Sequence, residues 1–181
     1  MTHFDVFNGD VDGICALHQL RLANPLVSDL ITGVKRDTQL IDGLPAKAGD
    51  SITALDIGLK QNNTAVTRLL ANGVRIRWID HHNPGEIPDH PAFESSINTA
   101  TDVCTSILVD RQLGGIYRPW AITAAFGDGL AGPARDLASG LNLTPSQTAG
   151  LSRLGELLNY NAYGETLADL WCQPKKLYSE L

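Results

Sequence analysis

Short apolar segments recur through the first hundred residues, and each is followed by a polar turn. Alternating or continuous apolar residues, many of them β-branched or aromatic, are typical of strands. Helical patterns over residues 14–22 and 62–71 lie between some of these segments, with Asn62 or Asn63 as the candidate cap of the second helix. The segments that predict strands are residues 4–7, 30–34, 52–56, 74–79 and, with a weaker pattern, 93–97.

Strands that alternate with helices predict an α/β fold with a doubly wound, mainly parallel sheet of about five strands. From residue 101 onward the pattern changes to helices only, over residues 101–113, 120–130, 146–158 and 165–171. Thr144-Pro145 forms a start signal for the third of these helices. We therefore expect a single domain over residues 1–181, with an αβ core over about 1–100 and a helical part over about 101–181.

Composition narrows the class of protein. No apolar stretch is long enough for a membrane span, and the first residues lack the pattern of a signal peptide, so we expect a cytoplasmic protein without a membrane partner. The 3 cysteines are far apart, which argues against a disulfide framework. The net charge of −6, without a basic block, excludes a basic nucleic-acid-binding surface at the level of composition, but leaves acids available as metal ligands.

The first acidic cluster is Asn8-Gly9-Asp10-Val11-Asp12-Gly13, which directly follows the first predicted strand. We interpret it as a turn-rich loop in which Asp10 and Asp12 project to the same side. One alternative is ordinary turn chemistry, for which Asp and Gly are common. Another is a calcium loop, but its twelfth position would be Gln19, and that site needs a bidentate Glu.

Three further clusters follow along the chain. A lone Asp56 ends the third strand, and Asp80-His81-His82 ends the fourth. Taken singly, an Asp at a strand end is usually a helix cap or turn former, and a His pair in a surface loop is more often unremarkable than a metal site. The last cluster is Asp128 between Gly127 and Gly129, inside an otherwise apolar helical stretch; this departure from good helix design is typical of a functional position.

Taken together, these residues predict a metal centre, because the carboxyl ends of parallel strands meet at one edge of a sheet, where ligands bind. Mixed carboxylate and imidazole ligands suit Mn²⁺, Mg²⁺ or Zn²⁺. Two such ions roughly 3.5–4 Å apart can activate water and bind a phosphoryl group. The candidate ligands are Asp10, Asp12, Asp56, His81 and Asp128.

The order of the four clusters resembles the DHH phosphoesterase family, over about residues 3–132. That family includes single-strand-specific exonucleases, oligoribonucleases, cyclic-dinucleotide phosphodiesterases, pyrophosphatases and exopolyphosphatases. The resemblance implies hydrolysis of a phosphodiester or phosphoanhydride bond by metal-activated water, with up to two ions, of which Mn²⁺ is favoured and Mg²⁺ is the alternative. The substrate class is a phosphate-containing molecule: a short oligonucleotide, a dinucleotide or a polyphosphate.

The resemblance also implies a role for each site residue. Asp10 and Asp56 hold one metal ion. His82 contacts the substrate phosphate, and Asp80 orients its neighbours. The second ion is held by Asp12, Asp56, His81 and Asp128, so that Asp56 bridges the pair.

Two departures from the family pattern leave other functions open. Many members carry a histidine where this chain has Val6, and Asn8 is a possible accessory ligand in its place. Residues 131–181 contain nothing that resembles the glycine-rich motif of the family's C-terminal substrate-binding domain, which we therefore expect to be absent. The alternatives are a non-catalytic or weakly active binding module that has lost part of the first metal site, and an unrelated α/β domain with accidental loop acids. The sequence predicts no oligomeric state.

Overall fold

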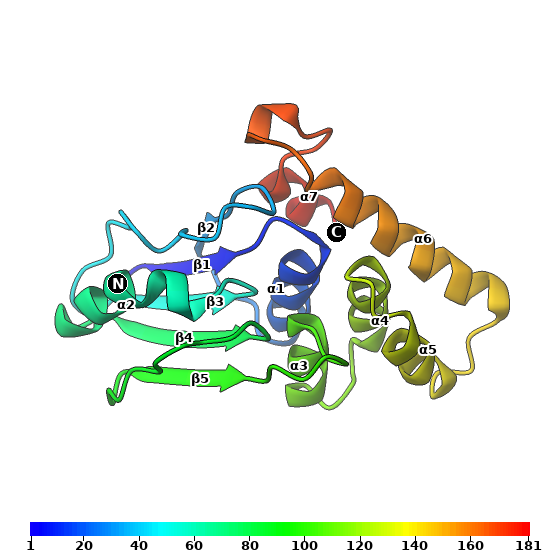
Figure 1. The fold of residues 1–181 in the computed structure, drawn as a ribbon, viewed down its shortest axis with the longest axis horizontal. Helices are drawn as coiled ribbons and strands as arrows, with labels where there is room; N and C mark the ends of the chain where they lie inside the picture. The colour runs from blue at the N-terminus through cyan, green and yellow to red at the C-terminus, as the bar shows by residue number, and fades with distance from the viewer.

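A single sheet, in which every strand pair is parallel, organises the protein (Figure 1). The structure is a computed structural model that describes residues 1–181. From edge to edge, the order of the five strands is β2-β1-β3-β4-β5, which confirms the predicted α/β fold. The strands are β1 (His3–Phe7), β2 (Asp29–Ile31), β3 (Ser51–Leu55), β4 (Arg75–Asp80) and β5 (Phe93–Ile97).

The strand order reverses between β1 and β3. The chain leaves β1 for β2 on one side and leaves β3 for β4 on the other side. In open α/β sheets, ligands bind in the crevice outside the carboxyl ends of the strands at such a point. The first three acidic clusters of the sequence follow β1, β3 and β4, so the topology brings all three to this crevice.

Helices cover both faces of the sheet. α1 (Val11–Ala23) and α3 (Thr105–Gln112) share one apolar cluster with Phe7 of β1, whereas α2 (Leu59–Ala71) shares the other cluster with Val6. Successive side chains of a strand point to opposite faces, so these neighbouring residues of β1 belong to different cores. In Figure 1, α1 and α3 lie beside the carboxyl ends of the strands, where the site is built.

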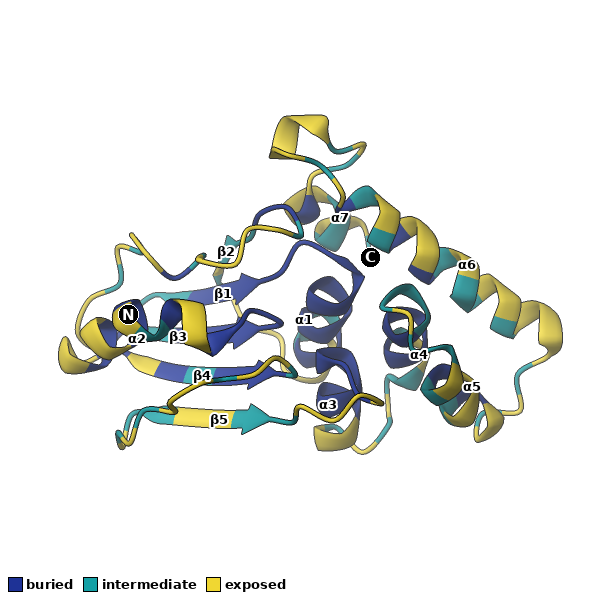
Figure 2. Ribbon diagram, in the orientation of Figure 1, coloured by how far each residue is buried: buried dark blue, intermediate teal, exposed yellow.

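Helices make up the rest of the chain: α4 (Arg118–Gly127), α5 (Ala131–Ser139), α6 (Pro145–Asn161), a 3₁₀ turn (Leu167–Asp169) and α7 (Pro174–Glu180). α6 runs along the outer side of α4, and its outward-facing residues are largely exposed (Figure 2). The predicted start signal of α6 is present, because Thr144 accepts a hydrogen bond from the Gln147 amide in a capping box. None of the helices combines the length and apolar content needed to span a membrane.

Close contact between α4 and α6 explains one of the glycines of the last acidic cluster. A Cβ atom on Gly127 would lie 2.5 Å from the carbonyl oxygen of Gly155, and one on Gly155 would lie 2.2 Å from that of Thr123. Only glycine permits this backbone approach. Gly127 therefore serves helix packing, and Gly129, with a φ of 80°, follows the end of α4.

Several predicted boundaries were wrong. α1 begins at Val11, three residues before the predicted start, so the second half of the first acidic cluster is helix and not loop. α2 begins at Leu59 after Gly58, and Asn62 caps nothing: its side chain donates to the carbonyl oxygens of Thr38 and Gly58. α3 begins at Thr105 instead of at residues 101–102.

The end of the chain was also predicted incorrectly. Residues 165–171 contain only the short 3₁₀ turn instead of a helix, and neither α5 nor α7 was predicted. α7 has only 7 residues, too few for an apolar period to be recognised. It is held by tertiary packing, in which the ring of Tyr178 contacts Phe7 with 5.9 Å between their centroids.

Candidate metal centre

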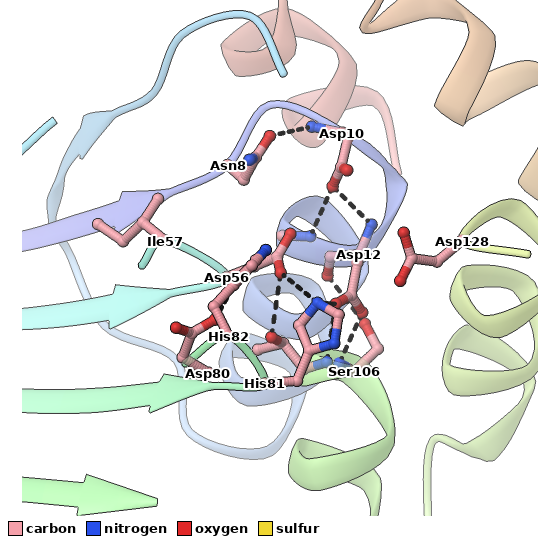
Figure 3. Close-up of polar contacts among 12 residues, drawn as sticks. Asn8, Asp10, Asp12, Asp56, Ile57, Asp80, His81, His82, Ser106 and Asp128 are labelled. Carbon is pink, nitrogen blue, oxygen red and sulfur yellow. Dashed lines mark hydrogen bonds and ion pairs between the residues drawn. The ribbon is translucent and has the colours of Figure 1, made fainter. Parts of the chain in front are cut away.

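The carboxyl edge of the sheet carries the four acidic clusters of the sequence, and their side chains converge there (Figure 3). Asp10 follows β1, Asp56 follows β3, and Asp80 ends β4 ahead of its two histidines. Asp128 reaches the same place from the C-terminus of α4, on the opposite side of the crevice. The predicted convergence of strand-end residues is thus present, and a helical residue joins them.

Asp10 is the N-cap of α1. Its Oδ1 atom accepts hydrogen bonds from the amides of Asp12, at 3.0 Å, and Gly13, at 3.2 Å. Aspartate is among the preferred N-cap residues because its carboxylate satisfies amides that have no partner within the helix. Asn8 is tied to the same turn, since its Oδ1 accepts from the Asp10 amide at 3.2 Å. This helical start contradicts the calcium-loop alternative; Gln19, at its twelfth position, lies buried within α1.

The carboxylate of Asp12 is held from the other side by the start of α3. Its two oxygens accept hydrogen bonds from the amides of Thr105 and Ser106, both at 2.7 Å. Amides at a helix N-terminus stabilise a negative charge. The sequence did not predict a role for Thr105 or Ser106. The only indication of one was their position directly after Cys104, near the start of a helical pattern.

Asp56 leaves β3 in the left-handed region, with a φ of 58°, a conformation that aspartate tolerates better than most residues. The Thr105 hydroxyl donates to its Oδ1 at 3.2 Å. Burial raises the pKa of the Asp56 carboxyl well above its usual value, and the charges of Asp12 and Asp10 raise it further. These buried carboxylates lie close together, and a bound cation would offset their mutual repulsion.

The two histidines after β4 take different positions. The Nε2 atom of His81 lies 3.4 Å from Oδ1 of Asp56 and 4.0 Å from Oδ2 of Asp12, so this imidazole lies between the two acids. His82 turns toward Asp80, whose Oδ1 atom is 2.7 Å from its Nδ1. That hydrogen bond raises the pKa of His82 above its usual value and outweighs burial, which lowers it.

Asp128 is affected by the same crowding as Asp56. Burial, followed by the charges of Asp12 and Asp10, raises the pKa of Asp128 to about 6.

Two groups of donor atoms have the spacing needed to hold an ion. Carboxylate oxygens together with imidazole nitrogens fit Mn²⁺, Mg²⁺ or Zn²⁺. Within each group the donor atoms lie within 4.8 Å of one another; one group is Asp12, His81 and Asp128, and the other is Asp56, His81 and His82.

Asp10 belongs to neither group, and the Asn8 side chain bonds to the Asp10 amide and to the Lys35 carbonyl oxygen. The second carboxylate oxygen of Asp10 is instead 2.6 Å from the ammonium of Lys35, a residue that sequence reasoning missed. Burial alone would lower the pKa of Lys35, but Asp10 and Asp128 raise it above its ordinary value. The signal in the sequence was its place just after the second strand, whose carboxyl end shares the edge of the sheet.

A cleft of about 170 Å³ opens over these residues. Its lining is almost entirely polar and includes both signs of charge. Asp12 is absent from the lining because it is 1% exposed and lies beneath the other groups. The lining residues are Asn8, Asp10, Lys35, Thr38, Asp56, Ile57, Gly58, Gln61, His81, His82 and Asp128.

Comparison with known proteins finds similarity only among solved structures, since no family model and no curated protein matches. The fold is similar to that of the exonuclease RecJ bound to manganese, with a TM-score of 0.50 and 23% identity over 89% of this chain and 48% of that chain. RecJ of Thermus thermophilus in complex with Mn²⁺ gives a TM-score of 0.50 and 16% identity over 99% of this chain and 34% of that chain. This chain thus spans less than half the length of either neighbour, and the similarity shows a shared fold.

Proposed function

We propose that this protein is a metal-dependent phosphoesterase that hydrolyses a phosphodiester or phosphoanhydride bond. The observation that carries the proposal is the convergence of Asp12, His81 and Asp128 within 4.8 Å at the point where the strand order reverses. The resemblance of the four acidic clusters to the DHH phosphoesterases and the fold shared with manganese-bound exonucleases support it.

The residues that would hold a divalent ion are Asp12, His81 and Asp128, with Asp56 next to them. Mn²⁺ fits this mixture of carboxylates and imidazole, and Mg²⁺ is the alternative. When bound, such an ion polarises a phosphoryl oxygen and makes water a stronger nucleophile at neutral pH. The amides at the start of α3 fix the orientation of the Asp12 carboxylate before any ion arrives.

His82 is the residue that we assign to the substrate phosphate. Its side chain is 49% exposed and lines the cleft, while Asp80 is fully buried behind it. The Asp80 carboxylate fixes the orientation of the imidazole and favours its protonated form, which can donate a hydrogen bond to a phosphate oxygen. Asp80 therefore acts as a positioning residue, through His82.

The lining of the cleft supports a phosphate-containing substrate. A largely polar cleft with a lysine, two histidines and several acids suits a phosphoryl group better than an apolar ligand. We assign the substrate to phosphate-containing molecules, of which a short oligonucleotide, a dinucleotide and a polyphosphate are the candidates. Assays on one member of each class would distinguish them.

The test is hydrolysis after chelation. Protein treated with EDTA is assayed on bis-p-nitrophenyl phosphate, a short oligonucleotide and a polyphosphate, without metal and with added Mn²⁺. We expect activity only with the ion, and we expect His81→Ala and Asp128→Asn to abolish it. Asp89→Asn, at an exposed aspartate outside the cleft, is the matched control and should keep full activity. Full activity in His81→Ala and Asp128→Asn would overturn the proposal.

A binding module without catalysis is the second candidate. The observation in its favour is the ion pair between Asp10 and Lys35, which engages a residue expected to hold metal. Binding of Mn²⁺ by calorimetry separates the two: a protein that binds no ion at any concentration up to the millimolar range is the binding module, whereas a bound ion supports the enzyme.

A further inference from the structure

The ammonium of Lys35 lies inside the acidic cluster. Its Nζ atom is 2.6 Å from Oδ2 of Asp10 and 3.7 Å from Oδ1 of Asp128. It also donates a hydrogen bond to Oδ1 of Asn159 at 3.0 Å and lies 5.6 Å from the centre of the Tyr163 ring. Four groups from three separate parts of the chain thus surround one positive charge.

The backbone of Lys35 is anchored as well. Its amide donates to the carbonyl oxygen of Ala162 at 3.2 Å, just after α6, and its own carbonyl oxygen accepts from the Asn8 side chain at 3.2 Å. A surface lysine normally loses considerable rotamer entropy when its ammonium is held in one place. Here the two backbone bonds fix the main chain, and the contacts of the ammonium with Asp10, Asn159 and Tyr163 hold the side chain in the cleft without any ligand.

Both carboxylate oxygens of Asp10 are already occupied by partners within the protein. One carboxylate oxygen of Asp10 accepts the amides of the first turn of α1, and the other oxygen faces the ammonium. The neighbouring residues at the end of β1 and just after it offer no replacement. Val6 is buried in the apolar cluster beneath α2, and the amide of Asn8 is engaged by its hydrogen bonds to Lys35 and Asp10.

From these contacts, and because the two groups of donor atoms share His81, we infer that the Lys35 ammonium takes the place of a second metal ion. The centre then binds a single divalent ion at Asp12, His81 and Asp128. The inference rests on the proposed metal centre and specifies its stoichiometry. Lys35 also lines the cleft, so its charge faces the same space as His82. A fixed ammonium beside one ion neutralises phosphate charge as a second ion would, but it cannot activate water.

The number of bound ions tests this inference without any assay of activity. Purified protein is dialysed against Mn²⁺, and bound manganese is measured by elemental analysis and by calorimetric titration. We expect one equivalent in the natural protein and two in Lys35→Gln, because loss of the ammonium frees a carboxylate oxygen of Asp10. Lys35→Arg keeps the charge and should stay at one. Lys60→Gln, at an exposed lysine near the same edge of the sheet, is the control and should also stay at one.

Thermal unfolding provides a second readout, which also checks that the variants fold. In EDTA we expect Lys35→Gln to melt at a lower temperature than the natural protein, because Asp10 and Asp128 lose their counter-ion. Excess Mn²⁺ should raise its melting temperature more than it raises that of the natural protein. Two equivalents in the natural protein, or one in a folded Lys35→Gln, would overturn the inference but leave the metal centre intact. No bound manganese in any variant would overturn both.

Discussion

The Nδ1 atom of His82 lies 2.7 Å from the Oδ1 atom of Asp80, which is fully buried at the end of β4. The other carboxylate oxygen of Asp80 has no hydrogen-bond partner. His82 is therefore the only hydrogen-bond partner of this buried side chain. A buried carboxylate with one partner serves chiefly to orient that partner and stabilise its charge. Through this pair, the buried end of β4 fixes the position of His82, whose side chain is exposed in the cleft.

Replacement of Asp80 by asparagine should leave the fold intact and disturb His82. The amide keeps the shape of the carboxylate but loses its charge, so the imidazole is less well oriented and less readily protonated. We expect a fall in kcat of about 10- to 100-fold, the usual size of such indirect effects, with the Mn²⁺ stoichiometry unchanged. Steady-state kinetics with the Asp89→Asn control measure the effect; an unchanged kcat would remove Asp80 from the catalytic arrangement.

Metal removal should lower thermal stability, because without a cation the charge of Asp12 repels those of both Asp56 and Asp128. At about 100 times its dissociation constant, an ion that binds only the folded state stabilises it by about 2.7 kcal/mol. For a chain of this length that corresponds to a rise in Tm of roughly 5–10 °C. Calorimetric scans with EDTA and with Mn²⁺ measure the difference.

The same scans on Asp128→Asn give the matched comparison. This substitution removes one of the repelling charges, so we expect its Tm in EDTA to equal or exceed that of the natural protein. Its gain on addition of Mn²⁺ should be smaller, because a ligand has been lost. A gain equal to that of the natural protein would show that Asp128 does not contact the ion.

Acid sensitivity should depend on Asp5, which is fully buried in β1, does not line the cleft and pairs with Arg21 of α1. Its Oδ2 atom accepts hydrogen bonds from Arg21 Nε at 2.8 Å and Ser28 Oγ at 2.6 Å. Burial alone would raise the pKa of the Asp5 carboxyl, but hydrogen bonds from His3 and Arg21 lower it below its usual value of 3.8. A folded-state pKa below the unfolded value means that this stabilisation is complete above 3.8 and is lost as the pH falls through the folded pKa.

Urea unfolding of Asp5→Asn at several pH values tests this dependence. At pH 7 we expect a loss of about 3–5 kcal/mol in the free energy of unfolding, because Arg21 keeps a buried charge without its partner. The difference between the natural protein and the variant should shrink as the pH falls below 3.8. A difference that stays constant down to about pH 2, well below the usual pKa of an aspartate, would contradict the lowered pKa of Asp5.

Packing between α4 and α6 should control both stability and the position of Lys35. Alanine at Gly155 would place a Cβ atom 2.2 Å from the Thr123 carbonyl oxygen, so α6 must shift. We expect a destabilisation of about 1–3 kcal/mol, as for other overpacked sites. Because Asn159 lies on the same helix and Ala162 is its C-cap, the shift should also weaken their contacts with Lys35.

Gly150→Ala is the matched control within α6. A Cβ atom at Gly150 meets nothing within 4 Å, so this substitution should stabilise the helix by about 0.5–1 kcal/mol through reduced backbone entropy. Chemical unfolding of the two variants side by side measures both effects. Equal stability of the two would contradict the close packing of α4 against α6.

Local patterns in the sequence determined the sheet and the positions of the strand-end residues. The strand over 93–97 was predicted with the bounds of β5, and Asp56 and His81 were expected at the carboxyl edge, where the structure has them. Both predictions rest on the period of two along a strand and on the common edge of parallel strands. The strand pattern can be recognised from neighbouring residues alone, and the common edge follows from the fold class.

Only the tertiary structure decided how the acids are used. Asp10 appeared equivalent to Asp12 in the sequence, yet Asp10 caps α1 and pairs with Lys35, whereas Asp12 accepts the amides of α3. Lys35 and Thr105 lie 25 and 95 residues from Asp10 in the chain, and no local pattern links such distant positions. They meet at the acids because the strand order and the packing of α3 and α6 bring them there. The sequence by itself thus determined which residues reach the edge of the sheet, and their distant partners determined which of them remain free to hold an ion.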